Sequence, residues 1–278
     1  MTKVYKNPVL GAIAGDMIGV PYEWYCKQGL EIPEGFPLWT DKSHFSDDTV
    51  MTIAIAEWLL DLPLNTDKLV KLMQKWGRLY RNAGYGHLFG KWLDSDDPQP
   101  YNSFGNGSAM RVSPVGCAFK TQETTMQIAE LSASVSHNHP EGIKGAKCIA
   151  DAIWYVRTYG EHFDKKDFIT WLTKYYLRIK LINRPEWIIK AGYKFDSTCQ
   201  GSVPEAVCCF LYSKSYEETI RNAIMLRGDA DTQAAIAGSI AAAYWGVPKD
   251  IHDECLERLP DDMFDILEHF SAMYDLEL

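Results

Sequence analysis

Two runs of the sequence would be apolar on nearly every side of a helix, and each follows a short cluster of acidic and hydroxyl residues. Residues 50–60 follow the segment SDDT at 46–49, and residues 234–245 follow the segment DADT at 229–232. A surface helix has one apolar stripe, whereas a helix that is apolar all round belongs inside a domain. We therefore expect two central helices whose acidic starts are at least partly buried.

Helical patterns dominate the rest of the chain. In residues 66–80 the apolar side chains recur every three or four positions, and Asn65 or Thr66 can cap that helix. Ser215 and Glu218 form a capping box before another helix, and Pro204 suits the first turn of a helix that begins near residue 203. Further helices are predicted at 124–136, 141–158, 166–178, 232–245 and 261–275.

The chain has no clear pattern of alternating strands, no long repeat, and no shift in composition that would mark a linker. We therefore predict an all-α fold with one domain that spans residues 1–278. Gly11, Gly15 and Gly19 stand at every fourth position, which is typical of close packing between helices.

Two long segments, 20–45 and 84–116, are predicted to be loops. Both are rich in glycine, proline, aromatic residues and aspartate. Long loops in a compact domain are often functional. Glu23 opens the first of them, where a mobile acid could cover a site.

Charge and cysteine content narrow the classes of function. The net charge is −9, which argues against a surface for nucleic acid or for an anionic membrane. Seven cysteines without a CxxC pair favour free thiols in a reducing cytoplasm. The longest apolar run, AAIAGSIAAAYWGV, is shorter than the roughly 20 residues that a bilayer span needs. We expect a cytoplasmic protein that does not enter a membrane.

The acidic clusters have two interpretations. Serine, threonine and aspartate are preferred helix caps, and acids suit the first turn of a helix. One helix start, however, needs one cap, and a buried carboxylate is costly unless it is paired or binds a metal. If the clusters at 46–49 and 229–232 met, hard divalent ions would suit their oxygen atoms, and a site with two ions is a natural solution.

Two further segments have the residues of a binding site. The loop YNSFGNGSAMRVSPVG at 101–116 could present backbone N–H groups to phosphate oxygens, although an ordinary surface turn fits it equally well. It is not a Walker loop, because no Gly-Lys-Ser/Thr follows. His137 in SVSHNHPEG could contact a substrate or cap a helix. The segment GNGSAM lacks the GxSxG pattern of a serine hydrolase.

Five segments together resemble one family. In order, they are GAIAGDMIGVPYE, FSDDTVMT, FGNGSAMRVSPVG, SHNHPEGIKGA and GDADTQAAIAGSIAAAYWG, and they run from residue 11 to residue 246. This pattern resembles the ADP-ribosylglycohydrolase family, which includes the dinitrogenase reductase-activating glycohydrolases and the ADP-ribosylhydrolases.

The resemblance implies a compact all-α fold with a binuclear Mg²⁺ site, or Mn²⁺ in some members. It places Glu23 near the metals and the scissile ribose. We expect the catalytic acids to be Asp48 and Glu23: either would take the proton of the attacking water or donate to the leaving group, and the sequence leaves the two roles open. The first cluster usually begins with threonine in the family, and Ser46 replaces it here. The remaining implied residues are six metal ligands (Ser46, Asp47, Asp48, Asp229, Asp231 and Thr232) and four substrate-binding residues (Asn106, Gly107, Ser108 and His137).

The implied function is metal-dependent hydrolysis at C1″ of ADP-ribose, which would release ADP-ribose from a modified protein side chain or a small conjugate. Nucleic acid would enter only as an ADP-ribosylated substrate. Two alternatives remain open. One is a non-catalytic protein that binds ADP-ribose or has a structural role on the same fold, and the other is a dimetal nucleotide phosphohydrolase.

Overall fold

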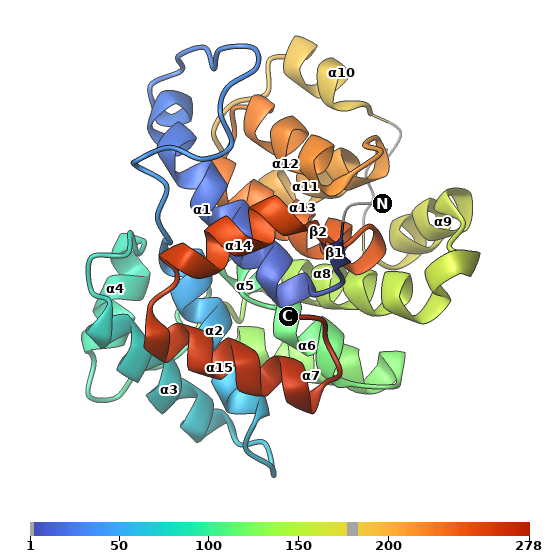
Figure 1. Cartoon of the computed structure of the whole chain (residues 1–278). Helices are drawn as coiled ribbons and strands as arrows, with labels where there is room; N and C mark the ends of the chain where they lie inside the picture. The colour runs from blue at the N-terminus through green and yellow to red at the C-terminus, as the bar shows by residue number, and fades with distance from the viewer. Residues whose placement is uncertain (1–2, 177–182) are drawn as a thin grey trace.

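The computed structural model describes residues 3–176 and 183–278, and within them the chain is mostly helical (Figure 1). The predicted all-α fold is confirmed. In chain order the elements are β1 (Val4–Tyr5), α1 (Pro8–Lys27), α2 (Asp47–Leu59), α3 (Thr66–Leu79), α4 (His87–Asp94), α5 (Gly107–Met110), α6 (Ser113–Ala118), α7 (Gln122–Ser134), α8 (Pro140–Tyr159), the 3₁₀ turn η1 (Gly160–His162), α9 (Lys165–Tyr175), α10 (Pro185–Lys190), α11 (Cys199–Leu211), α12 (Tyr216–Met225), α13 (Ala230–Tyr244), β2 (Val247–Pro248), α14 (Lys249–Arg258) and α15 (Asp261–Met273).

Helices α1 and α13 cross in close contact at the centre of the molecule (Figure 1). A Cβ atom added to Gly15 would lie 2.3 Å from the Ala234 carbonyl oxygen, and one added to Gly19 would lie 2.4 Å from the Asp231 Cα. Any side chain at these positions would push the helices apart. The close helix packing that the glycine spacing predicts is therefore present, and it brings the C-terminal half of α1 against the start of α13.

Helix α2 is the second central helix, as its apolar sequence predicts. Met51, Ile53, Ile55 and Trp58 have no exposed surface, although they lie on different sides of the helix. Helix α13 is buried in the same way along most of its length. The two acidic clusters therefore stand at the N-termini of two buried helices.

The first predicted loop is shorter than expected, and its start at residue 20 is wrong. Helix α1 continues to Lys27, with Pro21 inside it. Tyr22 and Cys26 in this extension are buried in the core, and their burial keeps the helix intact beyond the proline. Glu23 consequently lies on a helix and does not open a mobile loop.

The second predicted loop, 84–116, contains the short helices α4, α5 and α6 and is not structureless. Pro204 lies in the middle of α11 and not in its first turn, because Thr198 caps that helix earlier by accepting a hydrogen bond from the Gly201 N–H. Of the two candidate caps for α3, Asn65 is the one that the structure shows, and the predicted cap at Ser215 is confirmed. The predicted helix 166–178 is present as α9, and its last two positions lie outside the described residues.

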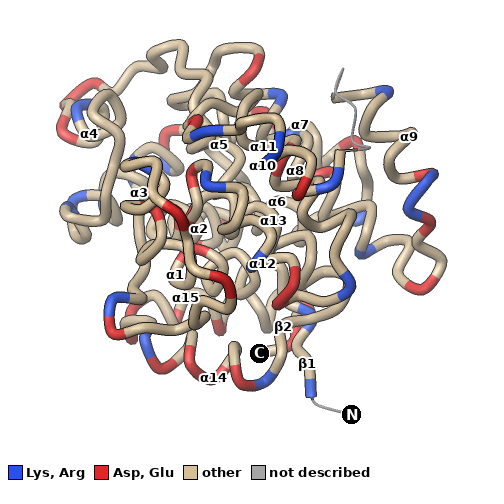
Figure 2. The backbone as a smooth tube through the Cα atoms, turned by 90° about the horizontal axis from the view of Figure 1, so that it is seen from above, with Lys and Arg blue, Asp and Glu red and all other residues tan. Residues whose placement is uncertain are grey.

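Figure 2 shows Lys and Arg interspersed with Asp and Glu over the described chain. Strands β1 and β2 pair antiparallel, with Val4 opposite Pro248 and Tyr5 opposite Val247. Among residues 3–176 and 183–278, no helix combines the length and the apolar character that crossing a membrane would take.

Candidate active site

The N-termini of α2 and α13 open onto one cavity of about 510 Å³. Its acidic part is lined by Glu23, Asp47, Asp48, Asp229 and Asp231. The rest of its wall includes the glycine loop at 105–107 and the side chains of Tyr101, Arg111 and His137. The two clusters that are far apart in the sequence therefore share one cavity.

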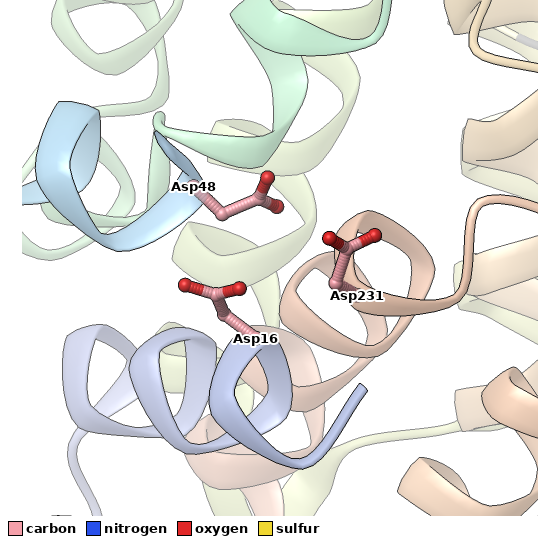
Figure 3. Close-up of side chains that lie close together, drawn as sticks. All are labelled: Asp16, Asp48 and Asp231. Carbon is pink, nitrogen blue, oxygen red and sulfur yellow. The ribbon is translucent and has the colours of Figure 1, made fainter. Parts of the chain in front are cut away.

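Carboxylate groups from three helices converge beside this cavity. Oxygen atoms of Asp16 on α1, Asp48 on α2 and Asp231 on α13 all lie within 4.8 Å of one another, and Figure 3 shows the three side chains turned toward a common centre. A second group, formed by Glu23, Asp229 and Asp231, meets the same limit. Asp231 belongs to both groups.

Asp16 is a residue that the sequence analysis did not assign to the site. Its carboxylate accepts hydrogen bonds from the backbone N–H and the hydroxyl of Ser46, and from both corresponding groups of Thr49. These bonds join α1 to the first turn of α2. One signal in the sequence could have identified it, because Asp16 is an acid inside an otherwise apolar stretch at 9–20.

The start of α2 combines a cap with acidic side chains. The Ser46 hydroxyl accepts from the Asp48 N–H at 3.1 Å and donates to Asp16 Oδ1 at 2.7 Å. Ser46 does not line the cavity, but a hydroxyl oxygen has two lone pairs, so one remains after capping. The Asp47 side chain lines the cavity and lies outside both carboxylate groups. Asp48 Oδ1 is buried without a hydrogen-bond partner in the described chain.

The start of α13 is held from outside its own helix. Asp229 occupies the N-cap position but makes no side-chain capping bond. Its Oδ2 accepts from the Asn106 amide at 2.7 Å, and the same amide nitrogen donates to Ser202 Oγ. The Thr232 hydroxyl lines the cavity and donates to Asp48 Oδ2 at 3.2 Å, which ties the two helix starts together.

Burial disfavours the charged form of these carboxylates. It raises the pKa of Asp48 and of Asp231 well above the usual range, and the neighbouring acids raise both further. Burial, with the charges of Asp16 and Asp229, raises the pKa of Asp47 to about 8. Burial raises the pKa of Asp229 to about 6, and the bond from Asn106 opposes that rise. A divalent cation would supply the positive charge that this arrangement lacks.

Glu23 lies one turn before the end of α1, where it forms an ion pair with Lys27. Both residues line the cavity, and the Glu23 side chain is 26% exposed. It is therefore the acid of the second group that solvent reaches most readily.

The predicted substrate-binding residues do not all face the cavity. Asn106, Gly107 and His137 line it, although the Asn106 amide is already bonded to Asp229. Ser108 is fully buried and outside the lining, and its hydroxyl donates to the Gly142 carbonyl oxygen at 2.7 Å. Any contact of Ser108 with a ligand would therefore have to come from the backbone.

The family model described as ADP-ribosylglycohydrolase matches residues 5–277. The chain belongs to the ADP-ribosylglycohydrolase family. The expected resemblance and the expectation of an enzyme of this family are thereby confirmed.

Several similar curated proteins are hydrolases by name. ADP-ribosylhydrolase ARH3 of Mus musculus is 26% identical over 90% of this chain and 87% of its own length, and the Homo sapiens protein of that name is 27% identical over 90% and 88%. ADP-ribosylarginine hydrolase Tri1 of Serratia proteamaculans is 23% identical over 91% and 75%. A solved ADP-ribosylglycohydrolase-related protein complex shares the fold, with a TM-score of 0.67, 20% identity, and coverage of 97% of this chain and 98% of that one.

Proposed function

We propose that this protein hydrolyses the glycosidic bond at C1″ of ADP-ribose and so releases ADP-ribose from a modified protein side chain or a small conjugate. The observation that carries the proposal is the convergence of Asp16, Glu23, Asp48, Asp229 and Asp231 beside one cavity. Membership of the family and the names of the relatives support the same reaction class.

The site suits two hard divalent cations, Mg²⁺ or Mn²⁺. The donors are carboxylate and hydroxyl oxygens, which such ions prefer, and the partnerless Asp48 Oδ1 is a donor that the protein itself does not use. Asp16 lies beside these donors, but its two oxygen atoms already accept four hydrogen bonds from Ser46 and Thr49, so we propose that it holds the start of α2 in place. When bound, the ions would neutralise the carboxylates and polarise oxygen atoms of the ribose. The proposed ligands are Ser46, Asp47, Asp48, Asp229, Asp231 and Thr232.

We assign proton transfer to Asp48 and Glu23. In the reaction, the bond from C1″ to the acceptor breaks with oxocarbenium character, a water oxygen adds to C1″, and one proton passes from that water to the departing acceptor. Glu23, which solvent reaches, is suited to take up the proton of the attacking water. Asp48 is almost completely buried, so a proton that it passes to the departing acceptor would be shielded from bulk solvent, and a cation at Oδ1 would keep Asp48 charged before and after that transfer. Its Oδ2, bonded to the Thr232 hydroxyl, is fixed in orientation.

The described cysteines are free and buried, which agrees with a reducing compartment, and we propose the cytoplasm. We also propose that residues 1–278 act as one domain. The proposed partner is ADP-ribose or an ADP-ribosylated protein. Nucleic acid would serve only as the carrier of an ADP-ribosyl group, because the chain is acidic.

The decisive experiment is a panel of defined ADP-ribosyl conjugates linked through arginine, serine, acetyl ester or nucleic-acid phosphate. Each would be incubated with the full chain in Mg²⁺, in Mn²⁺ and in EDTA, and the products separated by chromatography. We expect free ADP-ribose from at least one conjugate, loss of turnover in EDTA, and recovery when metal is restored. Release of inorganic phosphate instead would identify a nucleotide phosphohydrolase, and binding of ADP-ribose without turnover of any conjugate would identify a binding protein.

A further inference from the structure

Arg111 is a buried cation in the wall of the cavity. Its side chain is 1% exposed, and it forms no ion pair with a carboxylate of residues 3–176 or 183–278. Burial lowers the pKa of Arg111 to about 10, so the guanidinium stays charged at neutral pH. One of its nitrogens donates to the Ser132 carbonyl oxygen and to Ser136 Oγ, both at 3.0 Å. A buried charge without a counter-charge is costly, and a bound anion would offset that cost.

Ser136 connects Arg111 to His137 through two hydrogen-bonding contacts of its hydroxyl group. Ser136 Oγ lies 2.8 Å from His137 Nδ1. A guanidinium nitrogen is always a donor, so Ser136 Oγ accepts from Arg111. The hydroxyl has a single hydrogen, and among the described contacts His137 Nδ1 is the acceptor available to it. If Nδ1–H donated instead, the hydroxyl hydrogen would have no acceptor among the described contacts. The arrangement therefore favours Nδ1 as the acceptor and the ring hydrogen of a neutral His137 on Nε2.

The Nε2 atom of His137 is left uncovered by the glycine loop. A Cβ atom added to Gly107 would lie 3.0 Å from Nε2, and one added to Gly105 would lie 3.6 Å away. Nε2 has no hydrogen-bond partner within the part of the chain that the structure describes, and His137 lines the cavity. The rings of Phe89 and Tyr101 flank the imidazole at 6.2 and 5.9 Å. The glycine at 107 thus keeps a polar atom open to a ligand.

His137 remains uncharged in this environment. Burial lowers the pKa of His137 well below its usual range, and the charge of Arg111 lowers it further. A neutral imidazole is either a donor or an acceptor at a given nitrogen, and its neighbours decide which. Here the Ser136 hydroxyl, which accepts from Arg111, favours Nδ1 of His137 as the acceptor and Nε2 as the donor.

We propose that Arg111 and Ser136 are positioning residues that fix His137 as the Nε2–H tautomer, so that it donates a hydrogen bond to a diphosphate oxygen of the ligand. The uncompensated guanidinium makes this part of the wall favourable for an anionic oxygen, whereas the acidic part is not. The ligand identity rests on the proposed function, but the tautomer does not.

The tautomer is measured directly by long-range ¹⁵N–¹H NMR correlation of the histidines in the full, ligand-free chain. We expect His137 to show an unprotonated Nδ1 and a protonated Nε2, and Ser136→Ala to produce a mixture of the two tautomers. Ser134→Ala is the matched control, because the Ser134 hydroxyl donates to its own helix at the Glu130 carbonyl oxygen. A protonated Nδ1 in the unaltered protein, or an unchanged Nε2–H signal in Ser136→Ala, would overturn this relay from Arg111 through Ser136 to His137.

The contact with the ligand is measured by calorimetry with ADP-ribose and with ADP. Ser136→Ala should weaken both by about three- to tenfold, the effect of one hydrogen bond. Gly107→Ala should weaken both as well, because its methyl group would crowd Nε2 while the backbone conformation stays accessible to alanine. A loss with ADP-ribose but none with ADP would overturn the assignment to the diphosphate. Failure of every conjugate to turn over would reject the hydrolase but leave both measurements interpretable.

Discussion

The two acidic helix starts have similar sequences but different support. At α2, Ser46 caps the helix from the adjacent position, and the Asp47 N–H donates to the Ala83 carbonyl oxygen. At α13, Asp229 makes no side-chain capping bond and is held by Asn106, a residue far away in the sequence. The capping interpretation therefore fits Ser46. It does not fit Asp229, and Asp231, which accepts from the Thr232 N–H, lies inside the first turn and not at the cap position.

The difference shows what the carboxylates are free to do. In a capping aspartate, the side-chain oxygens accept hydrogen bonds from the N–H groups of its own helix. Asp48 leaves one buried oxygen without a partner, and Asp229 binds a side chain on another segment. Both starts thus present carboxylate oxygens to the cavity, and Asp231 is shared by the two groups that form there. This makes α13 the more important of the two starts for binding cations.

The largest effect is expected from Asp231→Asn, compared with Asp48→Asn. Each should reduce turnover of the best conjugate by about 10³-fold, because each removes charge beside the reacting ribose. They should differ in metal binding, because Asp231 belongs to both carboxylate groups and Asp48 to one. Calorimetry with Mn²⁺ should show both ions lost from Asp231→Asn and one retained by Asp48→Asn.

Asp151→Asn is the matched control for these substitutions. Asp151 is a fully buried carboxylate outside the cavity, bonded to Tyr176 and Gln122. Its substitution should leave the number of bound ions unchanged. If Asp231→Asn bound two ions as tightly as the unaltered chain, α13 would not have the role inferred from the comparison.

The second-largest effect on turnover is expected from loss of the hydrogen bond that Asn106 donates to Asp229. Asn106→Ala removes the amide that orients this carboxylate, and loss of such an outer contact typically reduces metal affinity or activity by about 10- to 100-fold. Ser202→Ala removes the other partner of the same amide and leaves the bond to Asp229 in place. Steady-state rates should therefore fall much further for Asn106→Ala. Equal rates for the two variants would mean that Asn106 does not act through Asp229.

Much of this arrangement could be predicted from the sequence. The apolar runs and the glycine spacing indicated two buried helices and their close approach, and both are confirmed. Asp16 stands out as an acid inside an apolar stretch, but its partners at residues 46 and 49 come from another segment, and no local spacing identifies them. The extent of α1 was missed because burial of Tyr22 and Cys26 outweighs the local signal of Pro21. The role of Asn106 depends on a contact between distant segments, which spacing alone does not show.

Stability of the metal-free protein should depend on pH through these acids. In unfolded chains aspartate has a pKa of about 3.9, whereas in the folded chain the pKa of Asp229 is about 6 and that of Asp47 about 8. The folded state then binds more protons between these values, so stability falls as pH rises from about 4 to about 8. Bound cations favour the charged form of these carboxylates and should therefore prevent the fall in stability with rising pH. Thermal melts in EDTA and in Mg²⁺ should therefore differ more at pH 8 than at pH 6, and an equal difference at both would contradict the link between these acids and the ions.

Ser46→Ala is expected to have the smallest effect, and it distinguishes a role of Ser46 as a helix cap from a role as a cation ligand. Loss of the cap should cost about 1 kcal/mol and lower the melting temperature by about 2–4 °C. Ser215→Ala is the comparison, because Ser215 caps α12 through the Glu218 N–H and lies outside the cavity lining. Ser46 Oγ donates to Asp16 and accepts from one N–H, so one lone pair remains for a cation. The fall in melting temperature from Ser46→Ala should accordingly be larger in Mg²⁺ than in EDTA, whereas the fall from Ser215→Ala should be the same in both. Equal losses from Ser46→Ala in the two conditions would leave Ser46 as a cap alone and would assign cation binding to the carboxylates and Thr232.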